Sequence, residues 1–458
     1  MRLWDFIREA MLSNPNQVIC ESNAEMTYEE IVIFAEHFSK NLVGEKCCAI
    51  VCGSEMAASM ALLSCFAANV TAVPLSVRYG QAHCGKILNT IKPTAVITDM
   101  DGELRVLRFS DSDYIAPKVR PAVIMCTSGT TGNPKDIMLS DKNIISNVTD
   151  ICKYFDIGAN DTILISRPLY HCAVLTGEFL TSLIKGTRIR FYSDKFNPVQ
   201  LLSLISDDSI TVFCGTPSML GLMARIKRKE EKCSLKKISV SGEVMSAATS
   251  KAIKKAFSGA DIYYVYGLTE AGPRVSRLPP ELFGMCPYAV GYALDSVSLR
   301  VVKPNGVTAG DGEEGILWIK GDNIMLGYYN EPELTEKVLK DGWLCTGDIA
   351  VIEAGLLKIK GRSDDLIIRA GMNIYPQEIE EALKSDLRVS EVLVYGIDNR
   401  FSGTQIGMKI SGDFSDTDEV RRLCVKLLPS FWVPSVIELV DELPKNGSGK
   451  IIRRDKNA

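Results

Sequence analysis

The chain has 458 residues, of which 46% are hydrophobic and 24% are charged, and its formal net charge is −4. This length is typical of about three domain-sized units, and the near balance of charge argues against a nucleic acid or an acidic membrane as partner. The 14 cysteines and 3 histidines include no Cys-x-x-Cys pair, which argues against a zinc site. Scattered cysteines are typical of a reducing compartment, so we expect a cytoplasmic protein.

One uncharged stretch, Met56–Val77, is long enough to raise the question of a membrane span. Asn69, Pro74 and several small residues interrupt its apolar character. We therefore predict a buried, alanine-rich helix that leads into a short strand at Val70–Leu75, and no membrane span.

Strand-like and helix-like patterns alternate over most of the chain. Short apolar runs predict buried strands at Cys48–Cys52, Thr94–Thr98, Val123–Cys126 and Thr211–Cys214. After Ser140, which is placed to cap a helix, apolar residues recur at helical spacing at Ile144, Val148, Ile151 and Phe155. This alternation predicts an α/β fold with parallel-rich sheets.

The pattern changes twice toward the C-terminus. From about Ser296 the strands are shorter and the turns richer in glycine, which predicts a small β-rich subdomain. Beyond the charged run that follows Gly361, Pro376 is expected to begin a helix that carries Ile379 and Leu383. Proline is tolerated there because the amide hydrogen that it lacks has no partner in the first helical turn. A strand at Glu391–Gly396 follows. We expect an N-terminal domain over 1–361, a hinge over 362–364 and a mobile α+β C-terminal lid over 365–458.

The strongest local signal is a loop rich in glycine and hydroxyl groups, Thr127-Ser128-Gly129-Thr130-Thr131-Gly132-Asn133-Pro134-Lys135. It lies between a predicted strand and the capped helix, so its amides, hydroxyls and lysine can meet phosphate oxygens. It lacks the Gly-x-x-x-x-Gly-Lys spacing of the kinase and GTPase loop. Taken alone, a solvated polar turn is an alternative interpretation.

Further motifs follow in a fixed order. They are Arg167-Pro168-Leu169-Tyr170-His171, Ser241-Gly242-Glu243, Tyr266-Gly267-Leu268-Thr269-Glu270, Gly327-Tyr328-Tyr329, Trp343–Asp348, Gly361-Arg362-Ser363-Asp364, Gly371–Glu380 and Leu443–Ile451. This ordered set resembles the adenylate-forming superfamily of acyl- and aryl-CoA ligases, peptide-synthetase adenylation domains and beetle luciferases. The resemblance runs from about Thr27 to Arg453 and is closest in motif style to the acyl- and aryl-CoA ligases.

The resemblance implies an AMP-forming acid–thiol ligase that uses ATP, Mg²⁺ and either CoA or a phosphopantetheine thiol. Lys450 matches the catalytic lysine that bridges the acid and the α-phosphate. Glu270, with Thr130, matches the Mg²⁺ site, and His171 matches an active-site histidine that gates the acid pocket. The implied nucleotide-binding residues are Thr127, Ser128, Gly129, Thr130, Thr131, Gly132, Lys135, Gly242, Glu243, Tyr264, Tyr266, Gly267, Thr269, Asp348 and Arg362. The implied hinge is Asp364, the thiol channel is Gly371, Met372 and Asn373, and the acid pocket is Cys172, Ser241, Val265 and Gly267.

Several residues depart from the family pattern, and they bear on ATP binding, on the adenine contact and on the class of acid. Asp136 stands where a glycine usually follows the loop lysine, and it either weakens ATP binding or pairs with Lys135. Tyr264 stands where many members carry an amide side chain, so the adenine contact is expected from backbone. No aspartate lies near Cys172 to hold an ammonium group, and an unpaired ammonium in an apolar pocket is costly. We therefore expect an aryl or medium acyl acid, not an ordinary α-amino acid.

Alternatives stay open at this point. The acyl acceptor is either CoA or the phosphopantetheine of a separate carrier protein. A non-catalytic nucleotide-binding relative is a third possibility, against which the joint presence of Lys450, Glu270, Asp348 and Arg362 argues.

Overall fold

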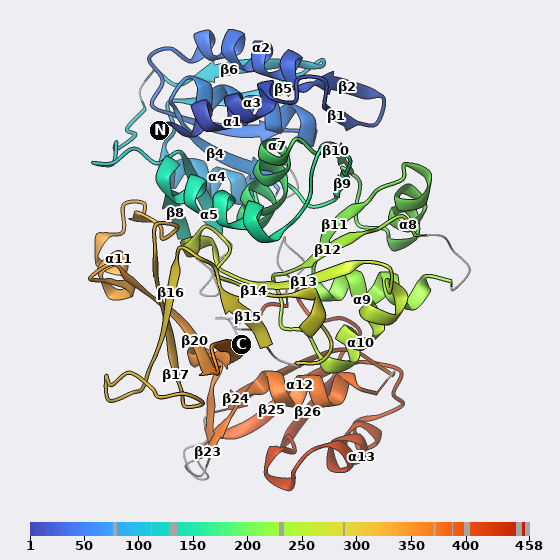
Figure 1. Ribbon diagram of the computed structural model, residues 1–458. Helices are drawn as coiled ribbons and strands as arrows, with labels where there is room; N and C mark the ends of the chain where they lie inside the picture. Colours follow the sequence, from blue (N-terminus) through green and yellow to red (C-terminus); the bar gives the residue numbers. More distant parts are fainter. Residues whose placement is uncertain are drawn as a thin grey trace.

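The computed structural model describes residues 1–76, 80–110, 112–127, 135–228, 233–286, 289–369, 372–386, 388–397, 404–445 and 451–453. The chain forms a mixed α/β structure, as the sequence predicts. Figure 1 shows the N-terminal elements at the top, the middle of the chain below them, and the C-terminal unit at the bottom.

The first sheet has seven strands within the described residues. Their order is β18 (Gly327–Tyr328), β8 (Lys135–Leu139), β7 (Val123–Thr127), β4 (Thr71–Ser76), β3 (Cys47–Cys52), β5 (Ala95–Met100) and β6 (Glu103–Arg108). Strands β7, β4, β3 and β5 run parallel, whereas the outer strands pair antiparallel. The predicted strands in this region are confirmed to within a few residues, and the uncharged stretch forms helix α3 (Glu55–Ala67) followed by β4.

The second sheet has more strands, and its pairing changes from parallel to antiparallel across the sheet. Its order is β16 (Val297–Val302), β17 (Glu314–Gly321), β20 (Trp343–Glu353), β21 (Leu356–Arg362), β15 (Ala289–Ala293), β14 (Ser276–Leu278), β13 (Asp261–Tyr266), β12 (Lys237–Val240), β11 (Val212–Gly215), β9 (Thr162–Ile165), β10 (Arg188–Phe191), β1 (Val18–Glu21) and β2 (Ala24–Thr27), with β19 (Leu339–Lys340) on β20. The strands from β13 to β1 run parallel. The remaining strands are antiparallel, in agreement with the β-rich subdomain expected after Ser296.

Helices pack against both sheets. They are α1 (Leu3–Leu12), α2 (Tyr28–Phe38), α4 (Gln81–Ile91), α5 (Asp141–Tyr154), α6 (Cys172–Val174), the π-helix η3 (Leu175–Leu180), α7 (Thr181–Lys185), α8 (Pro198–Asp207), α9 (Pro217–Ile226), α10 (Ala247–Ala256) and α11 (Pro332–Val338). Short 3₁₀ turns are η1 (Ser39–Leu42), η4 (Thr269–Ala271), η5 (Pro280–Leu282), η6 (Ser363–Asp365) and η7 (Ser430–Trp432).

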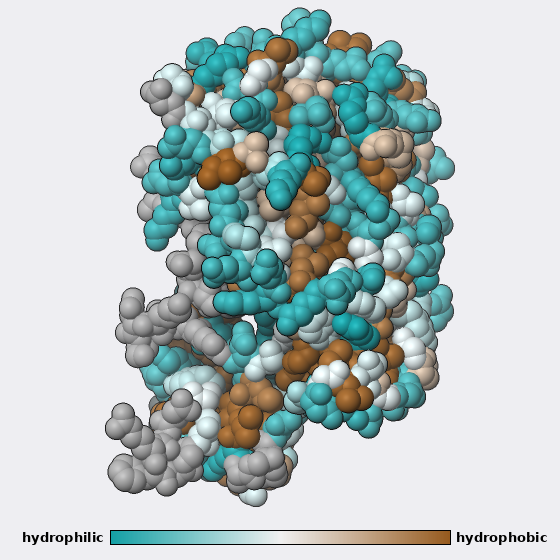
Figure 2. Space-filling view, turned by 90° about the vertical axis from the view of Figure 1, so that its left-hand side faces the viewer, coloured by the Kyte–Doolittle hydropathy of each residue, from teal (hydrophilic) through white to brown (hydrophobic). Residues whose placement is uncertain are grey.

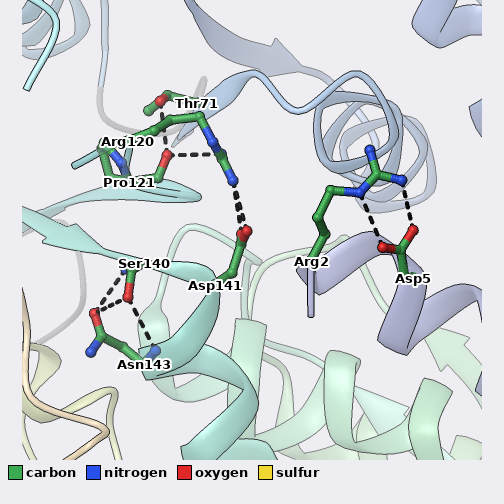
Figure 3. A network of polar contacts seen from close by, with 8 residues as sticks. All are labelled: Arg2, Asp5, Thr71, Arg120, Pro121, Ser140, Asp141 and Asn143. Carbon is green, nitrogen blue, oxygen red and sulfur yellow. Dashed lines mark hydrogen bonds and ion pairs between the residues drawn. The ribbon is translucent and has the colours of Figure 1, made fainter. Parts of the chain in front are cut away.

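Helix α5 begins at the capping signal that the sequence predicts. The Ser140 hydroxyl accepts from the Asn143 amide at 3.2 Å, and the Asn143 side chain accepts from the Ser140 amide at 2.8 Å, which completes a capping box (Figure 3). Beside it, the Arg120 guanidinium pairs with Asp141 at 2.9 Å. These contacts fix the start of α5 directly after β8.

The C-terminal unit has a core of its own. Its sheet consists of β24 (Val389–Ile397), β25 (Gln405–Gly412) and β26 (Val436–Leu439), with helices α12 (Pro376–Lys384) and α13 (Thr417–Leu427) and a ribbon of β22 (Ile367–Arg369) and β23 (Met372–Ile374). Ile379 and Leu383 of α12 are buried in this core, as predicted. The unit contacts the preceding sheet through Tyr375, whose hydroxyl donates to Glu314 of β17.

Among the described helices, none combines the length and the apolar character that a membrane crossing requires. On the face shown in Figure 2, hydrophobic residues form separate patches near the middle of the molecule, with hydrophilic residues between them. All 14 cysteines are free thiols.

Candidate active site

The parallel part of the second sheet brings distant motifs to one edge. Strands β9, β11, β12 and β13 are parallel neighbours, so their carboxyl ends lie together. Arg167 follows β9, Ser241 follows β12 and Gly267 follows β13. Such an edge is where parallel α/β sheets bind ligands. It therefore frames the candidate site.

Asp348 is the centre of a compact polar group. It lies opposite Arg362 in the register of β20 and β21, and the Arg362 guanidinium donates to Asp348 at 3.1 Å and to the Thr346 carbonyl at 3.0 Å. The Tyr266 hydroxyl donates to the other oxygen of the same carboxylate. Burial raises the pKa of Asp348, and the neighbouring Arg362 opposes this effect. Three side chains predicted for nucleotide binding are thus brought together from β13, β20 and β21.

Glu270 lies where the two large sheets meet. It belongs to η4, and its carboxylate accepts from the Tyr328 hydroxyl at 3.0 Å. Tyr328 is in β18, which pairs with β8 of the first sheet, and the Lys135 ammonium lies 5.3 Å from the centre of the Tyr328 ring. The loop lysine and the predicted metal-binding glutamate are therefore linked through one tyrosine.

The Gly242–Glu243 segment borders the same region. Gly242 has a positive φ of 96°, a conformation that favours glycine. The Glu243 carboxylate accepts from Ser218 at the start of α9, at 2.6 Å from the hydroxyl. The Tyr264 hydroxyl donates to the Glu243 carbonyl at 2.9 Å. Because this hydroxyl is already engaged, a contact of Tyr264 with adenine would use its backbone, as the sequence suggests.

The predicted acid-pocket residues lie around the same strand ends. Cys172, Ser241 and Val265 are buried. Gly267 cannot carry a side chain, because an ideal Cβ would lie 1.6 Å from the Pro273 carbonyl oxygen. His171 precedes α6, and its ring centre lies 4.2 Å from that of Tyr170.

Several predicted residues lie outside the described residues: Ser128, Gly129, Thr130, Thr131, Gly132, Gly371 and Lys450. Their flanks are described. Thr127 pairs with Lys135 at the end of the β7–β8 ladder, and Lys445 pairs with Ile451. The phosphate-loop and lysine assignments therefore stay predictions of the sequence.

Comparison with known proteins decides the family. Residues 7–329 match the family model described as AMP-binding enzyme, and residues 378–450 match the model of the AMP-binding enzyme C-terminal domain. The chain belongs to the AMP-binding enzyme family.

Relatives of this AMP-binding enzyme include a long-chain-fatty-acid–CoA ligase of Haemophilus influenzae, which is 32% identical over 74% of this chain and 63% of its own length. A feruloyl-CoA synthase of an Amycolatopsis species is 32% identical over 72% of this chain and 68% of its own length. Among solved structures, ATP-bound MatB from Rhodopseudomonas palustris superimposes with a TM-score of 0.86 at 25% identity, covering 98% of this chain and 97% of that one. The match thus spans less than two thirds of the Haemophilus ligase.

The structure of the AMP-binding enzyme also shows polar residues to which the sequence assigned no role. Tyr328 is part of a quoted motif, but its contact with Glu270 depends on the pairing of β18 with β8 and is invisible in the sequence. Thr346 orders the same group, since its hydroxyl accepts from the Asp348 amide at 2.9 Å. Arg274, only 2% exposed, carried no signal at all, because a single arginine gives no indication that it is buried.

Proposed function

We propose that this AMP-binding enzyme activates a carboxylic acid with ATP and then transfers the acyl group to a thiol. The observation that carries the proposal is the joining of Tyr266, Asp348 and Arg362 beside Glu270 at the edge of a parallel sheet. The ligase and synthase names of the relatives and the ATP-bound state of the MatB structure support it.

In the first half-reaction, a carboxylate oxygen of the acid attacks the α-phosphorus of ATP and the bond to pyrophosphate breaks. Two like charges about 4 Å apart repel by about 4 kcal/mol at an effective dielectric of about 20, so the site must supply cations. Lys450 neutralises the approaching carboxylate and the α-phosphate, while Lys135 meets the outer phosphates. Asp348 accepts from the ribose hydroxyls, and the Tyr266 ring stacks on adenine.

Glu270 fits a magnesium ion. One of its oxygens accepts from Tyr328, and the carboxylate as a whole is a hard oxygen ligand of the kind Mg²⁺ prefers. A magnesium ion at such a site usually has one or two carboxylate ligands together with phosphate oxygens of the nucleotide. When bound, the ion would neutralise charge on the departing pyrophosphate.

In the second half-reaction, a thiol sulfur attacks the acyl carbon, the acyl–phosphate bond breaks and AMP leaves. The lysine and the thiol channel would compete for one space, so the C-terminal lid turns about Asp364 between the two steps. This turn carries Met372 and Asn373 of β23 toward the acyl group. We favour CoA as the thiol and a cytoplasmic location, with a separate carrier protein as the alternative acceptor.

Acid-dependent exchange of labelled pyrophosphate into ATP tests the first half-reaction. Lys450→Ala should lose about 100- to 1000-fold in exchange, the scale of removing one oriented charge. The same variant should still transfer acyl from supplied acyl-AMP to CoA. Absence of exchange by the wild-type enzyme with aryl, fatty and small acids would contradict the proposed activity, and normal exchange by the variant would refute the role of Lys450.

A further inference from the structure

Three charged side chains lie together beneath the strand ends. Glu178, which is fully buried in the π-helix η3, accepts from the Arg167 guanidinium at 2.5 Å. Arg274 is only 2% exposed, and its charge acts on Glu178, Cys172 and Cys214. These three side chains hold two positive charges and one negative charge, and the Glu270 carboxylate, which also acts on Cys172, lies near them.

Arg274 is the cation without a carboxylate partner. In the part of the chain that the structure describes, no aspartate or glutamate lies within ion-pair distance of it, and Glu178 is already taken by Arg167. The Tyr154 hydroxyl is close enough to interact with Arg274, but it is neutral. Burial of a charge without a close counter-charge costs several kcal/mol, so an anionic ligand group at Arg274 would stabilise this arrangement.

Polar atoms without hydrogen-bond partners occur at the same edge of the sheet and on Glu178 itself. Within the described residues, Glu178 Oε2, Ser166 Oγ and Ser241 Oγ are buried without a hydrogen bond. Ser166 follows β9 and Ser241 follows β12, so both lie at the carboxyl edge of the sheet. Unsatisfied buried groups call for a ligand or an ordered water, and π-helices are frequent at functional sites.

The backbone of Arg274 is held by hydrogen bonds, and its guanidinium is closely packed. The Asn147 side chain donates to the Arg274 carbonyl at 2.7 Å and accepts from its amide at 3.2 Å. Gly177 makes room for the guanidinium, because an ideal Cβ there would lie 2.6 Å from Arg274 Nη2. Such fixation suits a residue that binds a ligand group in one geometry.

Arg274 also borders the residues expected to hold the acid. A Cβ on Gly267 would lie 3.0 Å from the Arg274 Cα, and both Arg274 and Glu270 act on the buried Cys172 thiol. The backbone of Arg274 therefore lies beside Gly267, and its charge acts on Cys172, which is another predicted pocket residue.

We propose that Arg274 binds a second anionic group of the substrate, so that the enzyme prefers acids that carry a carboxylate at the end distant from the activated one. This inference rests on the proposed adenylation activity and specifies its substrate class. The far carboxylate supplies a close counter-charge, and a guanidinium can hold it through two parallel hydrogen bonds.

Pyrophosphate exchange with a homologous series of aliphatic α,ω-dicarboxylic acids tests this inference, each acid being paired with the monocarboxylic acid of equal chain length. For the best pair, the wild-type enzyme should favour the diacid by roughly 10- to 100-fold in kcat/KM, the scale of a charge-assisted hydrogen bond. Arg274→Met keeps the volume and removes the charge, so it should lose this preference while retaining exchange with the monoacid. Arg274→Lys should keep part of the preference.

A second readout does not depend on catalysis. The diacid, but not the monoacid, should raise the Tm of the wild-type enzyme, and it should leave the Tm of Arg274→Met unchanged. Preference for monoacids or hydroxy acids by the wild type, or an equal loss on both acids in Arg274→Met, would overturn the inference and leave the adenylation activity standing. Absence of exchange with every acid, together with absence of any Tm shift, would overturn both.

Discussion

Asp136 is a carboxylate in an unusual place, directly after the loop lysine. The sequence left open whether it pairs with Lys135 or weakens ATP binding. Successive residues of a strand point to opposite faces, and Asp136 is buried beside Cys126 while Lys135 lies over Tyr328. No ion pair joins Asp136 to Lys135 among the described residues. Asp136 Oδ1 is buried without a hydrogen bond, while the Cys126 thiol interacts with the carboxyl group.

Asp136→Asn should therefore stabilise the protein at neutral pH. Burial raises the pKa of Asp136, so folding favours the protonated carboxyl. Its stabilising effect is complete below the ordinary carboxyl pKa and is lost as the pH rises through the folded-state pKa. The asparagine amide does not titrate, so the variant does not lose this stabilisation as the pH rises. We expect a gain of about 1 kcal/mol in the free energy of unfolding at pH 7. Urea titrations across pH should show the gain disappear toward acid pH.

Asp386→Asn is the matched control, and we expect it to change the free energy of unfolding in the opposite direction. Hydrogen bonds from Arg388 lower the pKa of Asp386 to about 2. This carboxylate stabilises the fold above its ordinary pKa, and that stabilisation is lost as the pH falls toward about 2. The control should thus lose stability at neutral pH. A loss in Asp136→Asn as well would show that the Asp136 carboxylate is stabilising where it lies.

At the scale of elements, the sequence predicted those helices and strands whose signals lie within the element itself. The helix after Ser140 and the strand Val123–Cys126 were recognisable because their periodicity and capping residues are local. The π-helix with Glu178 was not, since its sequence Leu-Thr-Gly-Glu-Phe-Leu gives no signal for the wider turn. The pairing of β18 with β8 joins residues far apart in the chain, so the link from Lys135 to Glu270 needed the structure. The grouping of Tyr266, Asp348 and Arg362 was expected from the family resemblance and not from the residues alone.

Ser140→Ala should destabilise helix α5 and the segment at Ile324 that helix α5 contacts. The variant removes the acceptor for the Asn143 amide, and the Asn143 side chain also donates to the Ile324 carbonyl at 2.7 Å, in the segment that leads to β18. Loss of a serine cap costs about 1 kcal/mol. We expect a lower urea midpoint with an unchanged m-value. The exposed Ser298→Ala in β16 serves as control and should change stability by less than about 0.5 kcal/mol; an equal effect of both variants would show that the cap contributes nothing.

At the scale of the whole molecule, polar contacts of side chains join the C-terminal unit to the preceding sheet. Besides the bond from Tyr375 to Glu314, Lys360 of β21 lies 3.6 Å from Glu378 of α12. Figure 1 shows β23 at the outer end of the molecule, away from β13. Strand β23, which carries the predicted thiol-channel residues Met372 and Asn373, is thus apart from β13 in this orientation. The turn of the lid between half-reactions stays a prediction.

The segment next to Lys450 is tied to this unit by an ion pair. The Arg453 guanidinium lies 2.5 Å from Glu380 of α12 and 3.7 Å from Asp365, next to the predicted hinge. The other oxygen of Glu380 accepts from the Val394 amide at 2.9 Å. Glu380 therefore connects the lid core with the chain next to the lysine, and Arg453 in turn approaches Asp365 beside the predicted hinge.

Glu380→Gln should misplace the lysine without unfolding the lid. The amide can still accept from Val394, but it loses the charge that holds Arg453, and its NH₂ group would face the guanidinium. Since small displacements of catalytic groups cost up to about 100-fold in rate, we expect pyrophosphate exchange to fall by about 10- to 100-fold. Transfer from supplied acyl-AMP to CoA, which does not use Lys450, should stay within about twofold of the wild type. Arg388→Gln, which breaks the Arg388–Glu419 ion pair elsewhere in the same unit, should leave both half-reactions unchanged. Equal losses in the two half-reactions of Glu380→Gln would mean that Glu380 supports the lid as a whole and does not position the lysine.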